Sequence, residues 1–350
     1  MKYKLLYEKL KQTVQNSIRE GIEKLPAEAA LCRQYQLSRQ TVRQALDMLE
    51  ADGLVVRVKG SGTYITGLLS DPELNKIALL LPNDREYLYP GLIYDIRKEL
   101  TDHGFSSEVF LTGNSTYAER NILTGLLADT SRRGIIAEGC KSALPNPNLD
   151  LYQRLAKRNT HLVFLHHDYQ LPGCPCIKDD NIGGSRLLVN HLTEQGHTSI
   201  GAVFKSDDLQ GVERYLGFME TMRNLGQPVP DDRVVWYSDK ELTRLENRHD
   251  TAFLQTAIRD SFAECSAVIC QNDEIAYWLI RELRLAGYSL PEDMVITSFD
   301  NSYLNDAESH RLISLSHAPH AIGVTAAQTM IKKCRGLSAE SQIIPWELRS

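Results

Sequence analysis

Apolar and polar residues alternate along the first part of the chain with the period of an α-helix. Tyr3, Leu6, Leu10 and Val14 recur at intervals of three and four, which predicts an amphipathic helix over residues 3–20. A second short helix is predicted in "LPAEAALCRQY", because a proline stands just ahead of it and a glutamate lies in its first turn. The chain is therefore expected to begin with two helices.

A third helix is predicted after Ser38, a favourable N-cap residue, in the stretch "RQTVRQALDMLEADG". Its apolar residues Val42, Ala45, Leu46 and Leu49 share one face and are expected to turn inward. Two short strands, "LVVRV" and "TYIT", follow, and the turn "KGSG" between them is typical of a β-hairpin. Helix, helix, turn, helix and hairpin together predict a winged helix-turn-helix, a small α+β domain.

The outer face of the third helix carries side chains that can read DNA. Arg39, Gln40 and Arg43 lie near its N-terminal end, the end that enters the major groove in helix-turn-helix proteins. Lys59 and Gly60 at the hairpin tip are expected to lie against a phosphate backbone or a minor groove, since glycine lets the main chain come close. The alternative is that the arginines only solvate a helix surface. The combination of cap, spacing and hairpin favours DNA binding.

Charge is distributed unevenly along the chain. Residues 1–66 hold eleven Lys and Arg against seven Asp and Glu, a formal charge of +4. The whole chain carries −6, which leaves −10 on the remainder. A basic head on an acidic body indicates a polyanionic partner for the head alone.

The head resembles the GntR family of winged-helix regulators. The resemblance rests on the "LP-x-E" of the second helix, "LSRQTVRQAL" and "GSGTY", and it covers about residues 3–66. Many members carry an arginine where this chain has Ala29, so a phosphate contact is either lost or made instead by a lysine of the first helix or by Arg33. The residues expected to bind DNA are Lys2, Lys4, Arg39, Gln40, Thr41, Arg43, Lys59 and Gly60, with Thr41 and the first-helix lysines implied by the resemblance.

After the head, short apolar runs alternate with amphipathic helices. "KIALLLP" is typical of a buried parallel strand, and similar runs recur as far as "MVITSFD". Two successive rounds of such βα units predict two similar lobes with parallel sheets covered by helices on both faces. We therefore expect a multi-domain chain, with the head at 1–67, a linker at 68–75 and a two-lobed α/β body at 76–350.

Polar residues stand where the predicted strands of the body end. In parallel sheets, ligands bind in the crevice at the carboxyl ends of the strands. Arg214 is expected to point there from a helix, and Tyr87 and Tyr89 could stack on a sugar ring. Each residue could instead cap the next helix, but together they are typical of a sugar or polyol site. The strand-end residues are Asn83, Glu138, His166, Lys205, Asp207, Asn272, Asp273 and Asp300.

The body resembles the effector-binding domain of the LacI/GalR family, which is similar to periplasmic sugar-binding proteins. Matching blocks include "NIGGSRLLVNHLTEQGH" and "ISLSHAPHAIGVTAAQTM", and the match covers about residues 76–348. Family members usually have an acid where His166 stands, so a different pattern of ligand hydroxyls is expected there. Lobe 1 is expected at about 76–177 and 302–317, and lobe 2 at about 178–301 and 318–350. The implied sugar contacts are Asn83, His166, Arg214, Asn272, Asp300 and His317.

Two segments, "AEGCKSALPNPN" and "FKSDDLQGVERYLGF", are similar to those of the arabinose repressors of Gram-positive bacteria, which combine the same two domains. The resemblance implies L-arabinose or a related sugar as effector and adds Glu138, Lys205 and Asp207 to its pocket. No cofactor is implied. The chain is thus expected to be a repressor that binds a palindromic operator as a dimer and leaves it when sugar binds.

Other protein classes fit less well. No apolar run approaches the roughly 20 residues that span a bilayer, and the N-terminus has no signal-peptide core, so a cytoplasmic protein is expected. Cys174 and Cys176 lack a second pair at zinc spacing, and no metal site is expected. Neither a nucleophile elbow nor a glycine-rich phosphate loop follows a strand, which argues against an enzyme. A regulator that senses another sugar or a nucleoside remains the alternative.

Overall fold

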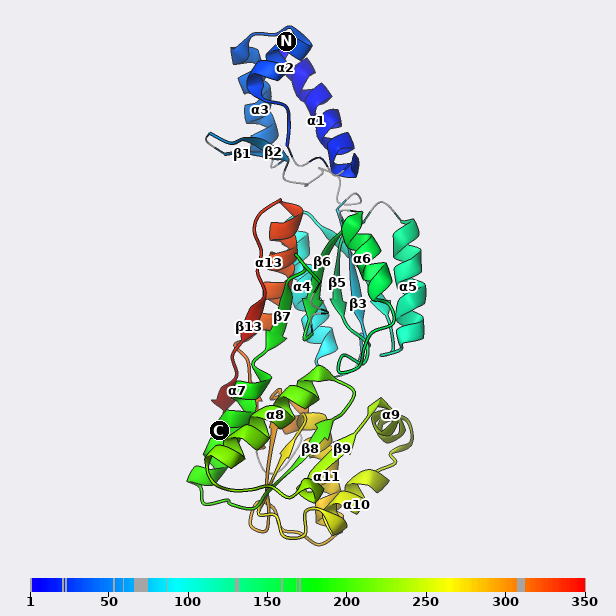
Figure 1. Ribbon diagram of the computed structural model, residues 1–350, viewed down its shortest axis with the longest axis vertical. Helices are drawn as coiled ribbons and strands as arrows, with labels where there is room; N and C mark the ends of the chain where they lie inside the picture. Colours follow the sequence, from blue (N-terminus) through cyan, green and yellow to red (C-terminus); the bar gives the residue numbers. More distant parts are fainter. Residues whose placement is uncertain are drawn as a thin grey trace.

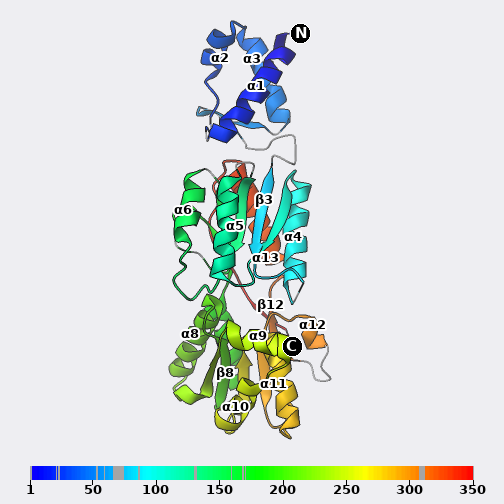
Figure 2. The ribbon, with the colours of Figure 1, turned by 90° about the vertical axis from the view of Figure 1, so that its right-hand side faces the viewer.

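The computed structural model shows three bodies that follow one another along its long axis (Figures 1 and 2). They are a small head and the two lobes of a larger body. The expected fold class is confirmed. The structure describes residues 2–20, 22, 24–52, 54–58, 60–65, 75–85, 87–129, 132–158, 160–167, 169, 171–306 and 312–349.

The head packs three helices and a hairpin around one apolar core. Leu46 and its helix neighbours Val42, Ala45 and Leu49 are fully buried, as their spacing predicts. The hydroxyl of Ser38 accepts a hydrogen bond from the Thr41 N–H at 3.3 Å and so caps the third helix. The elements are α1 (Lys2–Glu20), α2 (Glu28–Tyr35), α3 (Arg39–Ala51), β1 (Val55–Val58) and β2 (Gly62–Ile65).

The hairpin is fastened to the segment that precedes α2. Leu25 donates its N–H to the carbonyl of Thr63 at 2.9 Å, and the Lys24 ammonium donates to the carbonyl of Ser61. The same ammonium lies 5.1 Å from the centre of the Tyr64 ring. These contacts hold the hairpin at a fixed place beside α3.

Lobe 1 is a six-stranded, entirely parallel sheet in the order β13-β7-β6-β5-β3-β4. Successive residues of a strand face opposite sides, so Leu79 packs toward α4 and α13 while Leu80 packs toward α5 and α6. The elements are β3 (Lys76–Leu81), α4 (Tyr89–Asp102), β4 (Ser106–Leu111), α5 (Thr116–Ala128), β5 (Arg132–Glu138), α6 (Leu149–Lys157), β6 (His161–Leu165), β7 (Cys176–Asp179), α13 (Ala321–Cys334) and β13 (Gln342–Ile344).

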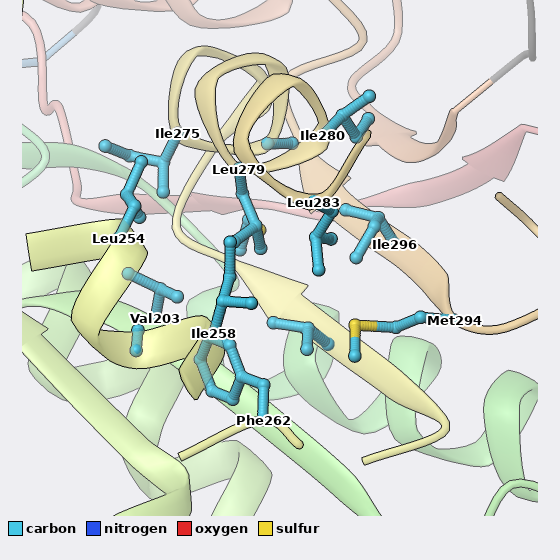
Figure 3. Close-up of a cluster of buried hydrophobic side chains, with 14 of the residues drawn as sticks. Val203, Leu254, Ile258, Phe262, Ile275, Leu279, Ile280, Leu283, Met294 and Ile296 are labelled. Atoms are coloured by element: carbon cyan, nitrogen blue, oxygen red, sulfur yellow. The ribbon is translucent and has the colours of Figure 1, made fainter. Parts of the chain in front are cut away.

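Lobe 2 repeats this plan with a sheet in the order β14-β12-β11-β10-β8-β9, in which only β14 is antiparallel to its neighbour. One apolar layer, with Leu254, Phe262 and Leu279, fills the space between the sheet and helices α10 and α11 (Figure 3). The elements are α7 (Asn181–Glu194), β8 (Ile200–Lys205), α8 (Leu209–Asn224), η2 (Asp231–Arg233), β9 (Val234–Tyr237), α9 (Asp239–Arg248), α10 (Ala252–Asp260), β10 (Ala267–Cys270), α11 (Asp273–Leu285), β11 (Val295–Phe299), α12 (Tyr303–Asp306), β12 (Ile313–Ser316) and β14 (Glu347–Arg349).

The chain crosses between the lobes three times. The first crossing follows β7, the second lies between β12 and α13, and the third lies between β13 and β14. The expected lobe limits are therefore wrong for β12, α13 and β13, whereas β14 lies in lobe 2 as expected. Strand β12 completes the sheet of lobe 2, whereas α13 and β13 return to lobe 1. Hydrophobic patterns do not say which of two similar sheets a strand joins.

Local boundaries also differ from the sequence reading. The pattern of the stretch "AERNILTGLLADTSRRG" predicts one helix through residue 134, but α5 ends at Ala128, and Arg132 and Arg133 already belong to β5. Strand β7, helix α9 and the two last strands are short or polar and were not predicted as such. Most of the predicted linker lies outside the described residues, but Asn75 is fully buried and accepts a hydrogen bond from the Ser106 N–H, so it belongs to lobe 1.

Candidate functional site

The exposed face of α3 carries the side chains expected to read DNA. Arg39, Gln40 and Arg43 are exposed, and the two arginines share one carboxylate, Glu28, at Nε–Oε distances of 3.0 and 3.1 Å. Burial opposes ionisation of Glu28, but hydrogen bonds from the arginines prevail and lower the pKa of its carboxyl. The glutamate thus orients both guanidinium groups on the surface of the head.

The other expected DNA contacts are placed less directly. Thr41 is half-buried, and its hydroxyl lies 2.9 Å from that of Ser38, so it supports the cap of α3. Lys4 is exposed on α1. Gly60 has a φ of +81° at the hairpin tip, a conformation that favours glycine. The side chain of Lys2 and the whole of Lys59 lie outside the described residues.

The body brings the strand-end residues together at the facing edges of its two sheets. Tyr89 donates a hydrogen bond to Glu138 Oε1 at 3.0 Å. From lobe 1, Tyr87 donates to Asp300 Oδ2 of lobe 2 at 2.7 Å, which closes the cleft at this point. Burial raises the pKa of both tyrosines and of Glu138 and Asp300. These side chains therefore lie in a desolvated, polar environment between the two lobes, and this region is called the cleft.

Three non-glycine residues of the cleft adopt left-handed backbone conformations. They are Tyr87, with a φ of 55°, His166, with a φ of 61°, and Asp300, with a φ of 97°. Such conformations are costly for residues with a Cβ atom and concentrate at ligand-binding sites. His166 and Asp300 directly follow β6 and β11, and Tyr87 lies in the segment between β3 and α4.

Arg214 is the most deeply placed cation of the cleft, with only 2% of its surface exposed. Its Nε donates to Asn181 Oδ1 at 2.9 Å, and its Nη1 donates to the carbonyl of Gln271. The guanidinium lies 4.0 Å from the centre of the Phe299 ring, and its Nη2 lies 4.0 Å from Asp300 Oδ1. A buried cation held on several sides is a rigid donor for a ligand oxygen.

Asp179 joins two histidines that were expected to bind the ligand. His166 Nδ1 lies 2.9 Å from Asp179 Oδ2, and His317 Nε2 lies 2.7 Å from Asp179 Oδ1. Burial lowers the pKa of His166, but the Asp179 carboxylate outweighs it and raises the pKa to about 9. His317 also reaches the carbonyl of Pro345 at 2.9 Å. Both ring nitrogens of His317 thus have partners within the protein, and a contact between His317 and the sugar stays a prediction.

Lys205 and Asp207 are engaged in contacts at the rim of the cleft. Lys205 Nζ lies 2.8 Å from Asp208 and 3.4 Å from Asp239. Asp207 accepts the N–H of Asp239 at 3.1 Å and lies 3.4 Å from Lys141 Nζ of lobe 1. These residues cap α9 and connect the lobes, so a role in holding the sugar stays a prediction for them.

Lobe 2 also uses two of the expected residues structurally. Asn272 caps α11 by accepting the N–H of Ile275 at 3.1 Å. Asp273 is fully buried and accepts hydrogen bonds from the hydroxyls of Ser298 and Ser314. It is held inside lobe 2, so the prediction that it contacts the ligand is wrong. Burial, and next the Asp300 carboxylate, raises the pKa of Asp273 to about 6. In lobe 1, Asn83 follows β3 and is half-buried, and its contact with a sugar stays a prediction.

Comparison with known proteins identifies both parts of the chain. Residues 2–65 match the bacterial regulatory proteins of the gntR family, and residues 189–348 match the periplasmic binding protein-like domain. An arabinose metabolism transcriptional repressor from Geobacillus stearothermophilus is 32% identical over 340 residues, which cover 95% of this chain and 92% of that protein. The chain belongs to this family of transcriptional repressors.

Two further proteins are similar to this chain. One is an arabinose metabolism transcriptional repressor from Halalkalibacterium halodurans, 29% identical, with 97% of this chain and 93% of that protein covered. The other is a LacI-type regulator from Alkaliphilus metalliredigens, whose crystal structure contains D-xylulofuranose. It matches with a TM-score of 0.65 at 21% identity and covers 79% of this chain and 97% of that chain, which shows the shared fold.

Since the relatives of the repressor are transcriptional regulators, the expectation that it is not an enzyme is confirmed. Among the described residues, no helix combines the length and apolar character needed to cross a bilayer.

Several residues of the repressor's cleft were missed by sequence reasoning. Asp179 and Asn181 stand at the first crossing, between β7 and α7, whereas Gln210 lies at the start of α8. A reading of "CIKD" as a strand would have placed Asp179 at a strand end with the other candidates. Gln271 acts through its backbone carbonyl, for which a sequence carries no signal.

Proposed function

We propose that this repressor is released from operator DNA by a small sugar, L-arabinose in the first place, which binds between the two lobes. The two relatives that match nearly the whole chain are both described as repressors of arabinose metabolism. At about 30% identity a pocket can change its preferred sugar through a single side chain. The identity of the sugar therefore rests on this resemblance and on the chemistry of the cleft.

The observation that carries the proposal is the mixture of buried donors and acceptors at the cleft. Glu138 Oε2 is buried and has no hydrogen-bond partner among the described residues, so it is an acceptor that a sugar hydroxyl can satisfy. His166 and Arg214 supply donors, and Asp300 supplies a second carboxylate. Hydroxyl groups both donate and accept, and a polyol matches such a set better than an apolar or a purely anionic ligand.

Contacts across the cleft indicate how binding acts on the lobes. Tyr87 and Asp300 bond across the cleft, and Asn114 of lobe 1 donates to Asp239 of lobe 2 at 3.0 Å. A sugar that bonds to both lobes stabilises this closed arrangement relative to an open one. We propose that two copies of the chain pair so that closure changes the spacing of their heads on a two-fold operator.

Operator release is the direct test. Duplexes selected from a random library by the purified full-length repressor provide the DNA, and fluorescence anisotropy measures its binding with L-arabinose, D-xylose, D-ribose or D-glucose present. L-Arabinose is expected to weaken operator binding most. By linkage, operator DNA must weaken sugar binding by the same factor in calorimetry. Equal operator binding with every sugar would contradict the proposal, and release by a different sugar would correct the effector only.

A further inference from the structure

The three crossings between the lobes are joined by one side chain. His317, on the second crossing, contacts Asp179 at the start of the first crossing at 2.7 Å and the carbonyl of Pro345 on the third at 2.9 Å. Its ring also stacks on Trp346, with centroids 3.6 Å apart and planes at 23°. The His317 ring therefore bridges two acceptor groups, a carboxylate at the first crossing and a backbone carbonyl on the third.

Asp179 connects these crossings with the ligand-facing side of lobe 1. Asp179 is 3% exposed, and its Oδ2 accepts hydrogen bonds from His166 Nδ1 at 2.9 Å and from Gln210 Nε2 at 2.6 Å. A carboxylate only accepts, so Nδ1 of His166 carries a proton. Within the described part of the chain, the polar contacts of the His166 ring lie at Nδ1, which donates to Asp179 Oδ2 and has Gln210 Nε2 beside it at 3.1 Å. The Nε2 atom is therefore the ring atom left for a ligand.

We propose that Asp179 is a positioning residue of the effector site: it fixes His166 so that Nε2 faces the ligand as a donor, and it ties that ring to the crossings through His317. The inference rests on the proposed function, because it names the residue that sets the donor pattern for the sugar. With both ring nitrogens protonated, His166 can donate to a sugar oxygen while Glu138 accepts from a hydroxyl.

The charges around His166 support its protonated form. Asp179 on β7 and Glu138 on β5 favour the imidazolium, whereas Arg214 on α8 opposes it. The balance raises the pKa of His166 to about 9, and Asp179 is the larger of the two favourable charges. Loss of the Asp179 charge is therefore expected to leave His166 neutral near pH 7, which turns Nε2 from a donor into an acceptor.

The closing experiment compares Asp179→Asn with a matched control, Asp95→Asn. Asp95 also pairs with a histidine, His320, at 2.8 Å, but on the outer side of lobe 1. Nitrogen-15 NMR of the histidine rings in the sugar-free, full-length protein follows the titration of His166, assigned by its loss in His166→Gln. Asp179→Asn is expected to lower the midpoint of His166 by about one pH unit or more. The control is expected to leave it unchanged.

Calorimetry with L-arabinose between pH 6 and 10 supplies the second readout. The wild-type affinity is expected to fall only as pH passes about 9, when His166 loses its proton, whereas that of Asp179→Asn falls near neutral pH. A merely structural role for Asp179 would weaken binding equally at every pH. The inference would be overturned if the sugar affinities of the wild type and of Asp179→Asn depended on pH in the same way. An unchanged titration of His166 in Asp179→Asn would also overturn it.

A second variant keeps the test decisive if Asp179→Asn does not fold. His317→Phe preserves the stack on Trp346 but removes both hydrogen bonds of the ring. His317→Phe is expected to weaken sugar binding about tenfold, while the titration of His166 keeps its midpoint. If His317→Phe bound sugar as tightly as the wild type, the proposed link to the crossings would be wrong. If the wild type binds no sugar, the proposed function fails, and the NMR titration still decides whether Asp179 controls His166.

Discussion

The face of the head that is predicted to read DNA and the cleft of the body differ in how their charged side chains are placed. The candidate side chains of the head, such as Arg39 and Arg43, stand on one helix, and 72% and 54% of their surfaces are exposed. Those of the cleft, such as Arg214 and Asp179, come from distant segments and are buried. Exposed charges act through screened, long-range attraction, whereas buried charges act through desolvation and fixed hydrogen bonds.

This difference indicates which variable controls each site. Contacts between the head and phosphate groups depend on salt, since each one releases counterions from DNA. Effector binding in the cleft is expected to depend instead on pH and on the pairing of each buried charge. A buried charge that has lost its partner cannot be solvated by water. Operator affinity is therefore expected to respond to salt, and effector affinity to protonation. The predictions below test this separation.

The largest effect is expected from Arg214→Met. The substitution keeps most of the side-chain volume but leaves Asp300 and the carbonyl of Gln271 without their cationic partner in a buried site. The body is expected to lose about 3–5 kcal/mol of stability in urea unfolding, together with sugar binding. Arg259→Met, at an exposed pair with Asp260, serves as the control and should leave the unfolding midpoint unchanged. Equal behaviour of the two variants would break the comparison.

Arg39→Ala is expected to have the next largest effect, and only on DNA. If Arg39 bonds a guanine through both of its donors, its loss costs about 1–3 kcal/mol of operator binding relative to nonspecific duplex, measured by anisotropy. Sugar affinity is expected to stay the same. Arg57→Ala is the control within the head, because Arg57 is held by Glu50 and Asp47. An equal loss of affinity for operator and for nonspecific duplex in Arg39→Ala would show that Arg39 acts through general charge and not through a base contact.

The stability of the body is expected to fall as pH rises past neutrality. His166 has a pKa raised to about 9, above the value of about 6.5 in an unfolded chain. Its stabilising contribution is therefore fully present below about pH 6.5 and is lost as pH rises through about 9. The loss over this range is expected to reach at most about 3 kcal/mol and is measured by chemical unfolding at each pH. His166→Asn should lack this loss, and an identical pH profile in that variant would assign it to another group.

The smallest effect is expected from Lys141→Ala at the rim of the cleft. Lys141 lies 3.4 Å from Asp207 across the lobes but is partly exposed, so its loss should cost only about 0.5 kcal/mol. Because the contact exists only when the lobes are closed, calorimetry should show sugar binding weakened by about twofold. Lys98→Ala, at a pair within α4, provides the control for a change of surface charge. Unchanged sugar affinity in Lys141→Ala would exclude this contact from closure.

Sequence reasoning worked best where structure depends on near neighbours. Ser38 caps its helix, Val42 and Leu46 turn inward and Arg39 turns outward because helical geometry fixes each of these from spacing alone. The parallel sheets could also be predicted, since alternating βα units leave few other solutions. These features need no knowledge of distant contacts.

The arrangement of the cleft was less predictable because it depends on how distant segments meet. The two partners of His317 stand 138 and 28 residues away from it in sequence. Nothing local distinguishes Asp273, which is enclosed by three serines, from Asp300, which faces the cleft. Candidate residue types could therefore be named in advance, but their division into core, hinge and binding surface could not.

The order of the strands also has a consequence for how the chain folds during synthesis. The head is continuous in sequence and can fold as soon as residue 65 has left the ribosome. Neither lobe has this freedom, because β13 and β14 add the edge strands of the two sheets only after residue 341. A nascent chain therefore carries a finished DNA-reading module well before it possesses the part that regulates it.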